Sequence, residues 1–131
     1  MGLFWIERVA YAGVMSGRWK LGPAGWICIL LVLAVWVVYL PVAGFDFTNY
    51  DDPDYVTKNP PVRAGLTWES LNWAFTHSHS ANWHPLTWIS HMLDCQFFGL
   101  NPGAHHLVNV AFHIANTLLL FGFLRYATGA F

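Results

Sequence analysis

The chain has 131 residues, of which 56% are hydrophobic and 18% aromatic, and it carries only six Lys or Arg and seven Asp or Glu. A soluble domain has about 25% charged residues, whereas this chain has 10%. The composition excludes disordered, collagen-like and nucleic-acid-binding chains, because each class needs a charge or repeat signature that is absent. We therefore predict an integral membrane protein of the all-α class.

Residues 22–45 are predicted to form the first transmembrane helix, after a cytoplasmic lead-in at 1–21. No Asp, Glu, Lys, Arg or His lies within the span, and residues 26–40 are almost wholly apolar. About 20 apolar residues are enough to cross the hydrocarbon core. A cleaved signal peptide is the alternative, with Ala43-Gly44 as the cleavage site, but its apolar core would normally be only about 7–15 residues long.

Residues 102–126 are predicted to form the second transmembrane helix. Asn101 is suited to the N-cap and Pro102 to the first helical position. Four polar side chains spaced 3, 4 and 3 share one helix face: His106, Asn109, His113 and Asn116. Because polar groups in hydrocarbon face a bundle interior or a wet cavity, we expect further helices, from another copy or from a larger bundle.

The distribution of charge predicts the membrane topology. Residues 46–101 hold six of the seven acids, whereas four of the six basic residues flank the spans: Arg8, Arg18, Lys20 and Arg125. The positive-inside bias then places both termini in the cytoplasm and the long loop outside. In a bacterium the multi-pass protein would lie in the inner membrane with this loop in the periplasm. Residues 127–131 would be a truncated cytoplasmic end.

The external loop is predicted to contain two short amphipathic helices. Asn49–Tyr55 is read as a tight acidic turn, and Asn59-Pro60-Pro61 as a second break. Thr67 caps an aromatic helix over 68–75 that lies along the membrane surface. The other helix runs from Pro85 to the residue before Gly99. Its apolar stripe is Leu86, Ile89, Leu93 and Phe97, and its polar face is Thr87, Ser90, His91 and Asp94.

Asp51 and Asp52 are the candidate catalytic residues, because they form an adjacent carboxylate pair just outside the first span. Such a pair can supply a general base, bind a divalent cation or cap a turn. Plain turn chemistry therefore stays an alternative interpretation.

The seven histidines raise the question of a metal or haem site. His106 and His113 lie on one helix face, but axial haem ligands approach the iron from opposite sides. The remaining histidine pairs lack a recognised zinc spacing. We assign no metal ligand and expect hydrogen bonding and polar packing for each histidine. Cys28 and Cys95 are expected to be free thiols, because they lie at different depths.

Several separated blocks of sequence resemble the N-terminal segment of the transmembrane and tetratricopeptide-repeat O-mannosyltransferase-like proteins, particularly their bacterial relatives. The resemblance covers roughly residues 44–121 and depends on the order of the blocks. These blocks are Asn49-Tyr50-Asp51-Asp52, Asn59-Pro60-Pro61-Val62, Asn82-Trp83-His84-Pro85-Leu86-Thr87-Trp88, Gly99-Leu100-Asn101-Pro102, His106-Leu107-Val108-Asn109 and His113.

The resemblance implies a polytopic C-type glycosyltransferase that moves a mannose-like sugar from a polyprenyl-phosphate donor to a hydroxyl of a protein or glycan acceptor. One acid of the pair would be the base, with Asp51 favoured over Asp52. No cofactor is assigned, although a divalent cation could assist the departing phosphate. The residues expected to bind substrate or donor are His84, His91, His106, Asn109 and His113.

The chain departs from the family pattern at His84-Pro85-Leu86, where eukaryotic members typically have Arg-Pro-Leu. A histidine holds phosphate less firmly than an arginine, which puts transfer of the same sugar in doubt. The family's further membrane helices and tetratricopeptide repeats imply that this chain is a catalytic-loop fragment, inactive alone, whose partners include the rest of the bundle and the lipid bilayer. The alternatives are a non-enzymatic assembly or scaffold protein with such repeats, and a His-liganded metal or haem membrane subunit.

Overall fold

The computed structural model describes residues 21–129, and these are helical apart from turns and one isolated bridge between His79 and Asn82. The predicted lead-in at 1–21 therefore lies, except for Leu21, outside the described residues. Helix η1 is a 3-10 helix and η2 is a π-helix. The elements in chain order are α2 (Pro23–Tyr39), η1 (Leu40–Gly44), η2 (Pro53–Thr57), α3 (Pro60–Arg63), α4 (Trp68–Thr76), α5 (Pro85–Phe98) and α6 (Pro102–Thr128).

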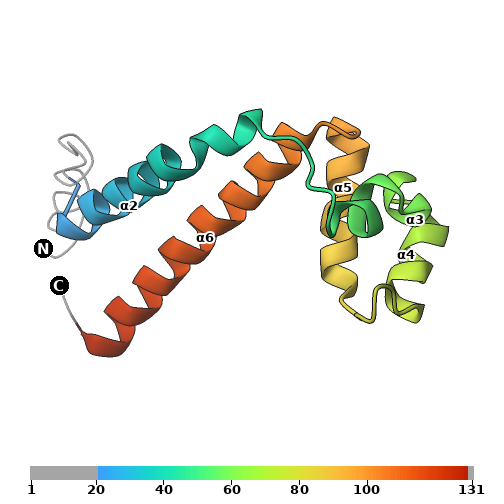
Figure 1. The fold of residues 1–131 in the computed structure, drawn as a ribbon. Helices are drawn as coiled ribbons and strands as arrows, with labels where there is room; N and C mark the ends of the chain where they lie inside the picture. Colours follow the sequence, from blue (N-terminus) through green and yellow to red (C-terminus); the bar gives the residue numbers. More distant parts are fainter. Residues whose placement is uncertain (1–20, 130–131) are drawn as a thin grey trace, which may run out of the picture.

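Helices α2 and α6 form an antiparallel hairpin, and the shorter helices lie beyond one end of it (Figure 1). Two segments, Pro23–Gly44 with 22 residues and Pro102–Thr128 with 27, are long and apolar enough to cross a membrane by length and composition. Most of their side chains are not covered by other parts of the chain. The all-helical class and two candidate membrane helices agree with the sequence prediction.

The two arms of the hairpin meet most closely where Gly103, in the first turn of α6, contacts η1. A Cβ atom at position 103 would overlap the carbonyl oxygen of Ala43. The absence of a side chain therefore allows two backbones to touch, as small residues do between membrane helices. As predicted, Asn101 caps α6: its side-chain oxygen accepts a hydrogen bond from the Ala104 N–H at 3.1 Å.

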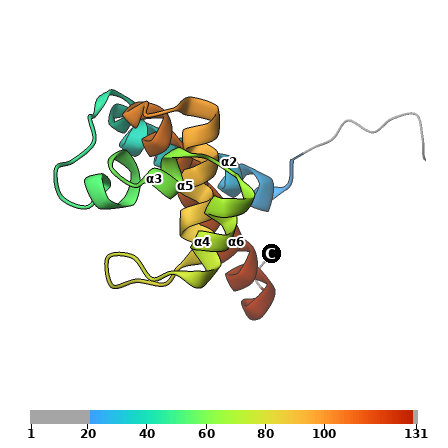
Figure 2. The ribbon, with the colours of Figure 1, turned by 90° about the vertical axis from the view of Figure 1, so that its right-hand side faces the viewer.

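Residues 45–101 form a second structural unit, which we call the loop group, with α5 at its centre. Helix α5 packs against η2, α3, α4 and α6, and Figure 2 views this group from the side opposite the hairpin, with α5 upright near the middle. The loop group has its own core, made by Val56, Val62, Ala74, Trp88, Met92 and Cys95, with Phe47, Tyr55, Trp73 and Ile89 packed against it.

The buried face of α5 is not the predicted apolar stripe. Trp88, Met92 and Cys95, spaced 4 and 3, face the core, whereas Leu86 and Phe97 of the stripe are 76% and 70% exposed. The bulky Trp88 fills the space between α5 and α4, where it meets the ring of Trp73 at 5.4 Å. The exposed side chains remain available to lipid or another helix, as the amphipathic pattern requires.

The predicted break at Asn59-Pro60-Pro61 is a helix start. Asn59 is buried and caps α3: its side chain accepts a hydrogen bond from the Val62 N–H at 3.4 Å and donates one to the Asp54 carbonyl at 3.1 Å. Proline suits the first helical position because its missing N–H would be unpaired there. The loop therefore holds four helical segments, two more than the sequence predicts.

Helix α4 starts as predicted at Trp68, and its N-cap Thr67 forms a reciprocal capping box with Ser70. Trp68 is 85% exposed and Phe75 is also exposed, so this aromatic side of α4 faces away from the core. Both cysteines are free thiols: Cys95 is buried in the core and Cys28 is half-buried in α2.

We predict that Gly103→Ala destabilises the hairpin by about 1–3 kcal/mol, because the added methyl group forces the backbones of η1 and α6 apart. The measurement is the loss of helical circular dichroism on denaturation in detergent micelles. Gly122→Ala is the matched control on α6, since a Cβ at position 122 meets nothing within 4 Å. Equal stability of the two variants would contradict the close contact.

We predict that Trp88→Ala lowers the free energy of unfolding of the loop group by about 3–5 kcal/mol, because it removes the largest side chain of a small core. The control is Trp68→Ala, which removes an exposed ring of the same type. The readout is the denaturation midpoint followed by near-UV circular dichroism. A midpoint for Trp88→Ala no lower than that of Trp68→Ala would show that the core is not formed around Trp88.

Candidate functional site

The acidic turn Asn49–Tyr55 follows the hairpin, and its last three residues begin η2. Its two adjacent acids have different roles. The Asp52 carboxylate accepts hydrogen bonds from the backbone N–H of Thr48 at 2.6 Å and from its hydroxyl at 3.2 Å. The Asp51 side chain is exposed and has no hydrogen bond to another described residue, while its backbone carbonyl accepts from Asp54 and Tyr55 at 3.0 and 2.9 Å. Asp52 therefore holds the turn, and the carboxylate of Asp51 stays available.

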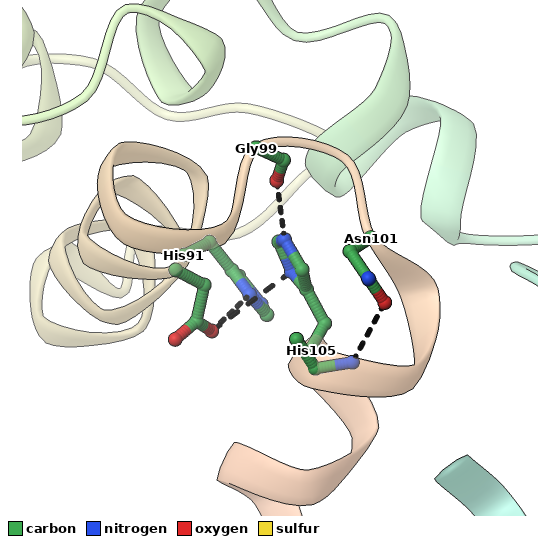
Figure 3. A network of polar contacts seen from close by, with 6 residues as sticks. His91, Gly99, Asn101 and His105 are labelled. Atoms are coloured by element: carbon green, nitrogen blue, oxygen red, sulfur yellow. Dashed lines mark hydrogen bonds and ion pairs between the residues drawn. The ribbon is translucent and has the colours of Figure 1, made fainter.

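A polar cluster lies where α5 meets α6. Gly99 ends α5 with a φ of +59°, a conformation that favours glycine, and the short connection turns α6 back against α5. His105 Nε2 donates to the Gly99 carbonyl at 2.9 Å, and the His105 N–H is bonded to the Asn101 carbonyl at 3.2 Å (Figure 3). The Nδ1 atoms of His91 and His105 each lie 3.9 Å from one carboxylate oxygen of Asp94. We call His91, Asp94 and His105 the junction cluster.

Burial dominates the electrostatics of the junction cluster. It raises the pKa of the Asp94 carboxyl, and the neighbouring His105 only partly opposes this effect. Burial also lowers the pKa of His91; His105 and His84 lower it further, whereas the charge of Asp52 acts in the opposite direction.

Two cavities flank the first half of α6. The hairpin cavity, of about 210 Å³, is lined by Tyr39, Val42, His106, Asn109, Val110 and His113. The junction cavity, of about 310 Å³, is lined by Leu86, Thr87, Ser90, His91, Asn109 and Phe112. Asn109 belongs to both linings, so it stands between the two cavities.

The predicted polar stripe of α6 faces η1 and α2 at its first three members. His106 Nε2 lies 3.4 Å from the Asp46 carbonyl, and the ring of His113 meets the ring of Tyr39 edge-on at 5.2 Å. Asn116 is exposed and lines neither cavity. The other arm of the hairpin therefore contacts part of the stripe and leaves Asn109, His113 and Asn116 exposed.

The structure brings most of the predicted substrate-binding residues close together, but it does so at two places. His91 and Asn109 meet at the junction cavity, and His106 and His113 line the hairpin cavity with Asn109. His84 packs against Trp88 and Tyr55, with ring centroids 4.8 and 5.6 Å apart, and its Nε2 has no hydrogen-bond partner among residues 21–129. His84 lines neither cavity, and the two predicted catalytic residues, Asp51 and Asp52, line neither cavity either.

The pairing of Asp94 with His105 cannot be seen in the sequence alone. Asp94 was placed on the polar face of its helix, and its i, i+3 spacing from His91 was the available signal. His105 gave no signal, because only the turn after Gly99 places it beside α5.

The described fold is an α-helical one, with two candidate membrane helices and an acidic, histidine-rich loop group between them. No family model matches the chain, and no solved structure matches it. The chain is 32% identical over 99 residues to human Protein O-mannosyl-transferase TMTC2. The aligned region covers 70% of this chain and 12% of the human protein. It is 33% identical over 88 residues to the Xenopus laevis protein of that name, covering 62% of this chain and 10% of the relative. The chain therefore spans only a small part of the length of these relatives.

We predict that Asp52→Ala lowers the free energy of unfolding of the loop group by about 1–2 kcal/mol, because two donors of Thr48 lose a charged acceptor. Asp51→Ala is the adjacent control and should change stability by less than about 0.5 kcal/mol, as for other exposed, unpaired side chains. Denaturant titration of both variants in micelles gives the comparison. A larger loss in Asp51→Ala would reverse the assigned roles.

Proposed function

We propose that this chain belongs to a membrane glycosyltransferase that moves a mannose-like sugar from a polyprenyl-phosphate donor to a hydroxyl group of a protein acceptor. The observation that carries the proposal is the 32% identity, over 70% of the chain, to a protein O-mannosyl-transferase. The acidic turn and the polar cavities support it, because hydroxyl activation needs a carboxylate and phosphate departure needs hydrogen-bond donors. Since the chain covers 12% of that relative, the activity is proposed for the gene's complete product.

In the proposed reaction Asp51 is the general base. Its exposed carboxylate makes no hydrogen bond to residues 21–129, so it can accept the proton of an acceptor hydroxyl. The hydroxyl oxygen then forms a bond to the anomeric carbon of the sugar, and the bond between that carbon and the phosphate oxygen breaks. The lipid phosphate leaves with the bonding electron pair. Asp52 contributes by holding the turn through Thr48.

The donor phosphate is proposed to bind near the histidines of the loop group and α6. His84 has a ring nitrogen without a hydrogen-bond partner among the described residues, and His91 opens onto the junction cavity. Asn109 connects this cavity with the hairpin cavity, where His106 and His113 lie. The apolar lipid chain would follow the exposed faces of α2 and α6, which are chemically similar to it.

We propose that α2 with η1 and α6 cross the membrane, with the loop group on the outer side and both chain ends in the cytoplasm. The antiparallel hairpin supports this topology, because the start of α2 and the end of α6 lie at one end of it and the loop group at the other (Figure 1). The acidic balance of residues 46–101 supports the same orientation. In a bacterium this places the reaction on the periplasmic face of the inner membrane.

The test of this proposal is sugar transfer in membranes that contain the gene's complete product, with radiolabelled polyprenyl-phosphate mannose as the donor and membrane proteins as acceptors. Asp51→Asn should lower transfer by about 100-fold or more, because the amide cannot accept the hydroxyl proton. Asp54→Asn is the matched control, an exposed acid three positions along whose loss should leave transfer nearly unchanged.

Membrane insertion of each variant is checked by carbonate extraction. Normal transfer by a correctly inserted Asp51→Asn protein would rule out Asp51 as the base. If Asp52→Asn instead abolished transfer, the base would be Asp52. Absence of any transfer by the wild-type protein with this donor would overturn the proposed donor class.

A further inference from the structure

We propose that the junction cluster of His91, Asp94 and His105 is a binding site for one divalent transition-metal ion of the Zn²⁺ class. The site joins α5, which carries His91 and Asp94, to the first turn of α6, which carries His105. It does not depend on the proposed sugar transfer, because it stands on the geometry of three side chains. Their potential ligand atoms all lie within 4.8 Å of one another.

The hydrogen bond to Gly99 shows which ring nitrogen of His105 carries the proton. Its Nε2 lies 2.9 Å from the Gly99 carbonyl, and because a carbonyl can only accept, Nε2 must carry a hydrogen. In the neutral ring Nδ1 then holds a lone pair. This lone pair faces the Asp94 carboxylate, another acceptor, at 3.9 Å, which is too long for a hydrogen bond. A cation between the two atoms would stabilise both.

The junction cluster contains buried polar atoms that lack hydrogen-bond partners. Asp94 is 5% exposed and His105 is 3% exposed, and a buried polar atom without a partner costs free energy. Nevertheless the Nδ1 atoms of His91 and His105 have no hydrogen-bond partner among residues 21–129. A proton on His105 Nδ1 would leave His91 Nδ1 unpaired, whereas a metal ion can bind both nitrogens and the carboxylate oxygen together.

The spacing also suits a metal ion. Ligand atoms bound to tetrahedral zinc at about 2.0–2.1 Å are separated by roughly 3.3 Å. The two Nδ1 to Asp94 distances of 3.9 Å therefore need to shorten by about 0.6 Å, and the third separation, which is within 4.8 Å, by at most about 1.5 Å. Side-chain rotations can supply such shifts.

The hydrogen bonding and packing around the junction cluster resemble those of known kinds of metal site. Ligating histidines commonly donate their second N–H to a backbone carbonyl, as His105 does to Gly99, and this hydrogen bond orients the ring. The ring of Phe47 also packs edge-on against His105 at 5.3 Å. Two imidazoles with one carboxylate suit zinc and similar metals better than calcium or magnesium, which prefer oxygen ligands.

Three protein ligands leave a fourth coordination position for water or an anionic oxygen. His91 lines the junction cavity, so this fourth ligand would come from that side. The ion would also tie α5 to α6, because its ligands come from both helices. It should therefore stabilise the contact between the loop group and the hairpin.

The experiment uses the purified wild-type chain in detergent, stripped with a chelator and titrated with Zn²⁺ by calorimetry. We expect one equivalent to bind with a Kd of about 10 µM or tighter, and a saturating concentration to raise Tm by about 5 °C or more. His105→Ala and Asp94→Asn should each lower the affinity at least about tenfold. His77→Ala, which removes an exposed histidine outside the cluster, should bind as wild type.

A second measurement needs no variant, so it decides the matter even if a buried substitution prevents folding. In the wild-type chain, Zn²⁺ should suppress carbethoxylation of His91 by diethyl pyrocarbonate, read by mass spectrometry, while His77 stays reactive. Failure of the folded wild-type chain to bind one equivalent would overturn the proposal. Equal protection of His77 and His91, or wild-type affinity in folded His105→Ala, would overturn it as well.

Discussion

The backbone contact between Gly103 and the Ala43 carbonyl organises the described part of the chain. It joins the end of the η1 arm to the start of α6, so the chain leaves the hairpin and returns to it at nearly the same place. Residues 45–101 are then closed into a loop whose ends are held together. Such closure reduces the entropy that the loop group would otherwise lose on folding. A small core around Trp88 can then stabilise a segment of short helices.

The same contact determines where the polar groups lie. With α6 held against η1, its first three stripe residues line the cavity beside the other arm of the hairpin, although Asn109 and His113 stay exposed. The turn at Gly99 directs the side chain of His105 toward Asp94 on α5. Adjacent residues His105 and His106 therefore serve different environments: one is buried in the junction cluster, and the other reaches the Asp46 carbonyl near the hairpin.

The acidic pair shows how one segment can combine structural and chemical roles. Asp51 and Asp52 are neighbours, and only one of their carboxylates accepts the hydrogen bonds of Thr48. Thr48 supplies two donors to Asp52, and this leaves the carboxylate of Asp51 exposed at the outside of the turn. In the proposed transferase these separate roles of Asp51 and Asp52 are useful, since a base must be accessible while its backbone is held still.

The sequence by itself determined the elements governed by local chemistry. Long apolar runs predicted the two hairpin helices, and the caps at Asn101 and Thr67 were read correctly because N-cap hydrogen bonds involve residues only three positions apart. Local patterns did less well at Asn59, where proline was read as a break although it also suits a helix start.

Only the tertiary structure decided which face of α5 is buried and which histidines meet an acid. Trp88 and Leu86 are both apolar by type, and the packing of α3 and α4 selects Trp88 for the core. Similarly, His105 and Asp94 are eleven positions apart and belong to different helices, so no helical spacing relates them. Their meeting depends on a positive φ at Gly99 and on a backbone contact at Gly103, since a long-range contact is set by how the chain turns in space.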